Sequence, residues 1–90
     1  MNISNLDGLN LVELNLFGNR IESIEGLTKL PHLRKLDLSR NRISKLEGLV
    51  HLVQLRELRL SENIIKRIKE LKYLENLVYL SVLDFCFNDI

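Results

Sequence analysis

The chain has 90 residues, the size of one small domain, and 46% of them are hydrophobic while 28% are charged. With 13 basic and 12 acidic residues the net charge is +1, so no overall field exists to attract nucleic acid or an anionic membrane. Charged residues interrupt every apolar run well short of the ~18 residues that span a bilayer, and a single cysteine, Cys86, rules out an internal disulfide. Together with the lack of a signal peptide, these features predict a reducing, intracellular setting, which we expect to be cytoplasmic, with the nucleus as the alternative.

One pattern of leucine, isoleucine and asparagine recurs along the chain. Its complete form is LRKLDLSRNRISKLEGL at residues 33–49, and the asparagines Asn19, Asn41 and Asn63 follow one another at intervals of 22 residues. A period of this length is typical of a solenoid, in which each repeat forms one coil. Ile3, Leu6 and Leu9 match the second half of a unit. We therefore expect a single array over residues 1–90, with about three full repeats and partial repeats at both ends. We also expect this array to be a fragment of a longer one.

Each unit divides into two chemically different halves. The first half alternates apolar and polar residues, which predicts a short strand that is buried on one face; its copies are Leu14-Asn15-Leu16, Leu36-Asp37-Leu38, Leu58-Arg59-Leu60 and Leu83-Asp84-Phe85. An asparagine follows each strand. A buried asparagine carries both donors and an acceptor, so we expect it to satisfy backbone groups where the chain turns out of the strand, and to bond between coils.

The second half places apolar residues three apart, as in Ile43, Leu46, Leu49 and Leu52. This spacing predicts short 3₁₀ or irregular helical turns with one inward residue per turn. The last such segment is longer, because Asn88 follows Asn63 by 25 residues. We expect a fuller α-helix there, beginning near Ile68.

The string Leu-x-x-Leu-x-Leu-x-x-Asn, followed by x-Ile-x-x-Ile, resembles the leucine-rich repeat family over nearly the whole chain. It is most similar to the 22-residue subclass found in the regulatory subunit of protein phosphatase 1 and in ciliary, spliceosomal and tubulin-folding proteins. The resemblance implies an α/β fold, a right-handed leucine-rich-repeat solenoid with short parallel strands on the concave face and 3₁₀ or short helices on the convex face. Neither family cap is recognisable at the chain ends, so we expect those ends to be covered by further repeats, a partner or a second copy.

The outward side chains of the strands are the candidate binding residues. Neighbouring coils lie about 4.8 Å apart, so equivalent residues touch and form rows across the sheet. The candidate partner-binding set is Glu13, Asn15, Phe17, Lys35, Asp37, Arg40, Glu57, Arg59, Asp84 and Phe87. The first row consists of Glu13, Lys35, Glu57 and Val82, and the second of Asn15, Asp37, Arg59 and Asp84. The charges alternate in sign within both rows, which favours cross-strand ion pairs over a site for a simple anion. A recognition surface for a protein with mixed charges stays open as the alternative.

Phe17 and Phe87 stand out in this set, because small or polar residues occupy most of the equivalent positions. An outward aromatic side chain is a candidate interface anchor. The alternative is that each ring covers an open end of the array. Cys86 has no nearby histidine or basic residue in its coil to lower its pKa, so we expect an inert thiol.

Two further features give weaker signals. Lys66, Arg67, Lys69 and Lys72 form the densest basic cluster, which could meet acidic tails or phosphates but is typical of a solvated surface. His32 and His51 lack the carboxylate or cysteine partners of a zinc site, so we predict no metal and no cofactor.

An enzyme needs a nucleophile or an acid/base pair in a concavity, and the sequence supplies no such set. The first hypothesis is therefore a non-catalytic scaffold that binds another protein, not nucleic acid or a membrane, through the concave face. The second is a structural segment of a cytoskeletal, ciliary or ribonucleoprotein assembly, or of a self-associated oligomer, held through its ends by Ile3, Leu6, Val82, Phe85 and Ile90. A third, phosphatase regulation, follows from the resemblance alone.

Overall fold

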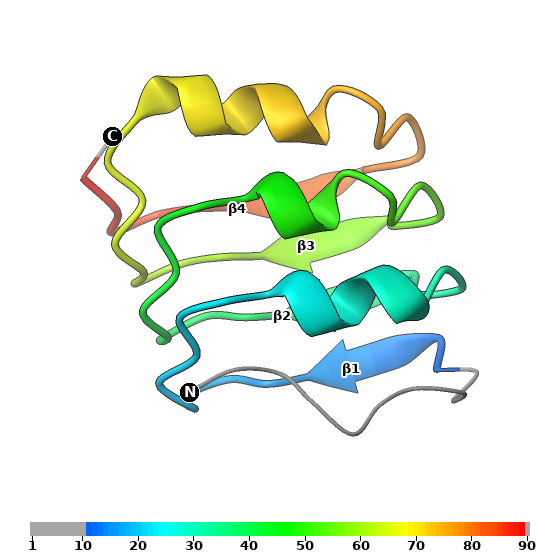
Figure 1. Ribbon diagram of the computed structural model, residues 1–90, viewed down its shortest axis with the longest axis horizontal. Helices are drawn as coiled ribbons and strands as arrows, with labels where there is room; N and C mark the ends of the chain where they lie inside the picture. Colours follow the sequence, from blue (N-terminus) through cyan, green and yellow to red (C-terminus); the bar gives the residue numbers. More distant parts are fainter. Residues whose placement is uncertain (1–10, 90) are drawn as a thin grey trace.

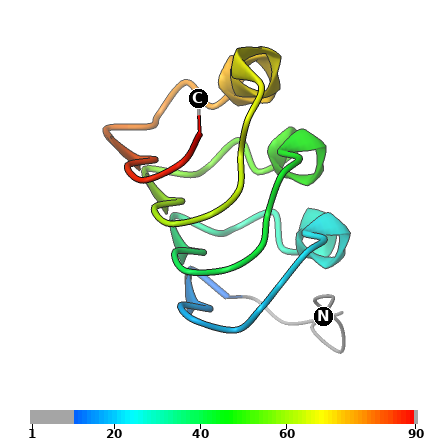
Figure 2. The same cartoon turned by 90° about the vertical axis from the view of Figure 1, so that its left-hand side faces the viewer.

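The computed structural model describes residues 11–89, apart from the side chains of Thr28 and Lys29. Four strands, β1 (Glu13–Asn15), β2 (Lys35–Asp37), β3 (Glu57–Arg59) and β4 (Val82–Asp84), form one parallel sheet in the order β1-β2-β3-β4. Between them lie three 3₁₀ helices, η1 (Glu25–Lys29), η2 (Glu47–Leu49) and η3 (Ile68–Leu74). Strands stack on one side of the molecule and helices on the other (Figures 1 and 2), which confirms the predicted solenoid.

Leucine and isoleucine side chains fill the space between the strand side and the helical side. Leu36, Leu58, Leu27 and Leu49 are at most 2% exposed, and they come from β2, β3, η1 and η2. Burying one such side chain stabilises the fold by about 1.5–3 kcal/mol. Each coil contributes the same residue types at the same places, so the core is a stack of equivalent layers. The 22-residue period of the sequence corresponds to one such layer.

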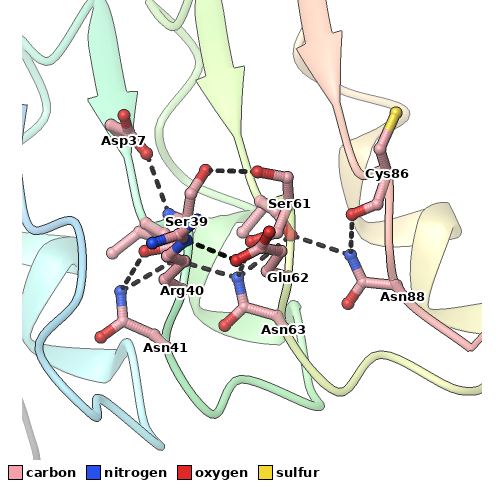
Figure 3. Close-up of polar contacts among 11 residues, drawn as sticks. Asp37, Ser39, Arg40, Asn41, Ser61, Glu62, Asn63, Cys86 and Asn88 are labelled. Atoms are coloured by element: carbon pink, nitrogen blue, oxygen red, sulfur yellow. Dashed lines mark hydrogen bonds and ion pairs between the residues drawn. The ribbon is translucent and has the colours of Figure 1, made fainter.

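The asparagines that follow β2, β3 and β4 bond within their own coil and to the coil before it. The Asn63 Nδ2 donates to Leu38 O at 2.9 Å and to Leu60 O at 3.0 Å, while its Oδ1 accepts from Ile43 N at 3.0 Å. Asn41 and Asn88 repeat this arrangement. Figure 3 shows bonds that the Nδ2 atoms of the three asparagines donate. The predicted structural role of these amides is confirmed.

The predicted strand limits differ from the observed ones by one residue, because each strand begins and ends one position earlier than the apolar triplets. The following leucines nevertheless continue the backbone ladder: Leu16 N donates to Asp37 O at 2.8 Å, and Leu60 N donates to Asp84 O at 2.6 Å. The expected limits therefore identified the extended segments correctly, but they placed each hydrogen-bonded strand one residue too far toward the C-terminus.

The prediction of an α-helix from Ile68 was wrong, because η3 is a 3₁₀ helix. Its inward residues, half-buried Leu71 and buried Leu74, are followed by buried Leu77, so one side chain turns inward every three residues. That interval matches three residues per 3₁₀ turn, whereas 3.6 residues per turn would rotate the later leucines away from the core. Ile68 itself is 72% exposed, unlike its buried counterparts Ile24 and Leu46, because the longer segment begins outside the core.

The predictions for Ile3, Leu6, Leu9 and Ile90 lie outside the described residues.

Candidate partner-binding face

We call the outward surface of the four strands and of the turns that follow them the strand face. The sheet register pairs Glu13 with Lys35, Lys35 with Glu57 and Glu57 with Val82. The second predicted row, Asn15, Asp37, Arg59 and Asp84, is aligned in the same way. The sequence thus predicted correctly which outward side chains are neighbours, while their role in binding stays a prediction.

Only some neighbours in these rows form ion pairs among the described residues. Lys35 Nζ lies 3.4 Å from Glu13 Oε1, and Arg59 Nη1 lies 4.0 Å from Asp84 Oδ2. Each side chain in these two pairs is at least one-third exposed, so each pair contributes about 0–1 kcal/mol. Only some of the alternating charges are therefore paired with one another among the described residues. The charged groups of the two pairs stay accessible to solvent.

Three members of the second row have a structural role that the sequence analysis missed. The side-chain oxygens of Asn15, Asp37 and Asp84 accept hydrogen bonds from the backbone N–H two residues ahead, at 3.0, 2.9 and 3.1 Å. Such Asx turns fix the chain direction as it leaves each strand. Arg59 occupies the same position in the third coil and cannot accept such a bond. It is the member of this row that the turn does not require.

Asp84 and Cys86 influence each other's ionisation through this turn. The Cys86 backbone N–H donates to Asp84 Oδ1, and this bond is the main reason that the pKa of Asp84 is lowered. The hydrogen bond between the Cys86 thiol and the Asp84 side chain raises the pKa of the thiol. A raised pKa leaves less thiolate at neutral pH, so the expectation of an unreactive thiol is supported.

The residue before each asparagine adopts a left-handed backbone conformation. Gly18, Arg40, Glu62 and Phe87 have φ values of 72°, 55°, 54° and 60°. Glycine accepts this conformation without strain, whereas other residues lose about 1–2 kcal/mol there. Backbone bonds hold the turn, since Gly18 N donates to Ser39 O at 3.0 Å and Arg40 N to Ser61 O at 2.9 Å. In the sequence, Gly18 was the one residue of this row whose type indicated a left-handed conformation.

Phe17, Arg40 and Glu62 form a contact row across three coils at the end of the strand face. The Arg40 guanidinium lies 5.4 Å from the centre of the Phe17 ring, and its Nε lies 2.5 Å from Glu62 Oε2. A cation over an aromatic face is attracted by about 0.5–1 kcal/mol at an exposed site. Phe17 is 49% exposed, so one part of the ring carries the guanidinium and another part faces solvent. The structure thus brings Phe17 and Arg40, two of the predicted partner-binding residues, into contact.

A shallow hollow of about 390 Å³ lies over the centre of the strand face. Its lining combines the outward charged residues of β1, β2 and β3 with two leucines, and consists of Glu13, Leu14, Asn15, Lys35, Leu36, Asp37, Glu57 and Arg59. Six of the ten predicted partner-binding residues line this one hollow. Phe17 and Arg40 lie beyond its end, while Asp84 and Phe87 belong to the fourth coil.

Other residues singled out from the sequence lie away from the strand face. Lys66, Arg67, Lys69 and Lys72 are exposed at and around the start of η3, and His32 and His51 are exposed. No group of three or more metal-ligating side chains occurs in residues 11–89. No helix in the same part of the chain is long and apolar enough to cross a bilayer.

Glu70 is a buried carboxylate that the sequence analysis did not single out. It is 8% exposed, and its Oε1 accepts a hydrogen bond of 2.9 Å from Leu46 N. It therefore satisfies the first backbone donor of the preceding helical turn. Gly48 shows the tight packing between such turns, since a Cβ added there would lie 3.0 Å from Ile24 O.

Comparisons with known proteins agree with this architecture. The family model described as leucine-rich repeats (2 copies) matches residues 9–51. Internalin C2 from Listeria monocytogenes is similar at 30% identity with a TM-score of 0.89, over 97% of this chain and 38% of that chain. An internalin, InlF, from the same species has 29% identity and a TM-score of 0.79, over 87% of this chain and 22% of that one.

A third similar structure is the SNF/U2A′ complex of Drosophila melanogaster, with 25% identity and a TM-score of 0.68 over 87% of this chain and 59% of the matched chain. This chain thus spans less than two thirds of each of the three structures. No curated protein sequence matches it.

Proposed function

Given that this chain belongs to the leucine-rich repeat family, we propose that it is a non-catalytic interaction module that binds another protein through its strand face. The observation that carries the proposal is the set of exposed side chains there that the fold does not require. Arg59 replaces a turn-forming residue, and Phe17 exposes half of its ring beside Arg40. Aromatic and arginine side chains dominate the energetics of protein interfaces.

The similar structures support a protein partner in general terms. One of them is a chain in the SNF/U2A′ complex, an assembly of more than one component. The internalins share the same coil architecture. A partner with its own mixed charges suits the strand face, because positive and negative groups alternate along its rows. A ligand whose charges all have one sign would be repelled by the groups of the same sign.

The test compares proteins captured from lysate by the immobilised chain with those captured by two double variants. The first carries Phe17→Ala and Arg59→Ala on the strand face. The second carries Tyr79→Ala and Arg67→Ala, an aromatic and an arginine that are both exposed outside the strand face. We expect captured proteins to be lost with the first variant and retained with the second, while both variants keep the circular dichroism spectrum of the wild type. Equal capture by all three proteins, or no specific capture by any, would contradict the proposal.

The alternative, assembly through the last coil, is favoured by one observation. Phe87 is 80% exposed and Leu83 is 38% exposed, although their neighbours in the array are smaller, polar or buried. In this alternative the chain associates with a second copy or with a larger structural assembly. Sedimentation velocity over a range of concentrations distinguishes the two functions, because a monomer at all concentrations argues against self-association. Phosphatase regulation has no support beyond the resemblance.

A further inference from the structure

The four residues immediately before the strands form a row of their own, which consists of Val12, Arg34, Arg56 and Ser81. Direct backbone bonds join them: Arg34 N donates to Val12 O at 2.7 Å, Arg56 N to Arg34 O at 2.8 Å, and Ser81 N to Arg56 O at 2.8 Å. Arg34 and Arg56 are therefore neighbours on adjacent coils. We call this part of the molecule the strand-entry edge.

Two like charges stand side by side in this row, whereas charges of opposite sign alternate within the charged rows of the strands. Directly opposed like charges destabilise a sheet. Both arginines are exposed, and neither has an ion-pair partner within residues 11–89. No ion pair inside the described part of the molecule therefore offsets the repulsion between them.

The two arginines share a hollow of about 330 Å³ that is lined by Val12, Glu13, Arg34, Lys35, Arg56, Glu57 and Ser81. Lys35 is engaged with Glu13 at 3.4 Å. The Ser81 hydroxyl donates to Arg56 O at 3.2 Å, so its proton is already used. The guanidinium N–H groups of Arg34 and Arg56 make no ion pair within residues 11–89, and each guanidinium offers a planar fork that matches a carboxylate.

We propose that the strand-entry edge binds carboxylate side chains from an acidic segment of a protein partner. Arg34 and Arg56 pair with the carboxylates, and the ligand relieves the repulsion between the two guanidinium groups. Arg34 and Arg56 stand on adjacent coils, so carboxylates spaced along a chain can each pair with one guanidinium group. A single phosphate group would concentrate its charge at one point of the row, and the phosphoserine arm of the test below separates the two ligands. This assignment names part of the partner's chemistry and rests on the proposed function.

The assay is fluorescence anisotropy at about 0.15 M salt, where exposed charges far from the site are screened. The probe is a labelled peptide with a run of about eight glutamates, and a neutral Gly/Ser peptide of equal length is the baseline. Two variants with the same change in net charge are compared: Arg34→Gln with Arg56→Gln, and Arg42→Gln with Arg67→Gln. Arg42 and Arg67 are exposed outside the hollow.

We expect the wild-type chain to bind the glutamate peptide above the neutral baseline, and the Arg34/Arg56 variant to bind it at least about tenfold more weakly, since two charge-assisted bonds are lost. The Arg42/Arg67 variant should lose less than about threefold, because it changes only screened, distant charge. Equal losses in the two variants would show general charge attraction and overturn the proposal. So would binding no stronger than that of the neutral peptide.

Two further arms complete the test. A phosphoserine peptide of equal total charge that binds more tightly than the glutamate peptide would overturn the carboxylate assignment, as would tighter binding of a single-stranded RNA oligonucleotide. The proposed function fails separately: capture that is insensitive to Phe17→Ala with Arg59→Ala overturns the strand-face interaction. Loss of glutamate-peptide binding in the Arg34/Arg56 variant would in that case still place an acidic ligand at the strand-entry edge.

Discussion

Replacing Asn41 with alanine tests how much the asparagine ladder stabilises the array. Asn41 Oδ1 accepts from Ile21 N at 2.8 Å, and this amide is buried. Alanine leaves that donor without a partner, which costs about 1–3 kcal/mol. The carbonyl of Leu38 keeps its bond from Asn63, so it is not orphaned. The bonds to half-buried Leu16 O and Asn19 N are lost as well, at about 0.5–1.5 kcal/mol each.

The expected total loss for Asn41→Ala is therefore about 2–6 kcal/mol of the free energy of unfolding, a large part of the roughly 5–13 kcal/mol that a domain of this length possesses. Urea denaturation followed by circular dichroism measures it. Asn19→Ala is the matched control. Among residues 11–89 the Asn19 side chain makes one hydrogen bond, to Phe17 O at 3.2 Å, so this variant should lose less than about 1 kcal/mol. Equal losses in the two variants would refute the assignment of buried amide bonding to the ladder.

Substitutions at three other residues test the packing and the ionisation of the array. Gly48→Ala places a Cβ 3.0 Å from the backbone of the preceding turn, so it should lower the stability by about 1–3 kcal/mol and lower the midpoint of thermal unfolding. Glu70→Ala leaves the Leu46 N–H without its acceptor and should cost about 1–3 kcal/mol in urea denaturation, whereas Glu70→Gln keeps an oxygen there and should cost less than Glu70→Ala. The lowered pKa of Asp84 stabilises the fold above the ordinary carboxyl pKa, and this stabilisation disappears as the pH falls through the folded value. Asp84→Asn should remove that dependence and lower the pKa of Cys86, so that the thiol is alkylated faster near about pH 8.5.

The period, the core and the strand register could be predicted from the sequence because they depend on repetition. Leu36 and Leu58 occupy the same place in successive coils, and a shift of one residue would turn both away from the core. The asparagine ladder was predictable for a related reason, since a buried amide that recurs at one place must bond to backbone in every coil. Both signals gain strength with each copy of the repeat.

The parts that could not be predicted depend on single residues that depart from the repeat. Glu70 looks like any exposed helical glutamate in the sequence, and only the fold brings it to Leu46 N. The type of helix in η3 was wrong because the extra residues suggested greater length, whereas the core required an inward leucine every three residues. Arg40 and Phe17 come together across coils at a turn whose left-handed conformation was marked only by Gly18.

The third coil is where the departures from the repeat gather. In the row that follows Leu58, the other coils carry turn-forming Asn15, Asp37 and Asp84, and the third carries Arg59. At the strand-entry edge the same coil places Arg56 beside Arg34. The repeat pattern does not require an arginine at this position, and the two like charges repel each other. Glu57 lies between Arg56 and Arg59 in the sequence, and no ion pair of Glu57 is found in the described part of the chain. The short strand β3 and the residue before it thus present a cation, an anion and a cation that the fold does not require. A partner that recognises this chain is therefore expected to contact β3 along its whole length, with its acidic segment at the strand-entry edge and its remaining contacts toward Arg59 and Phe17.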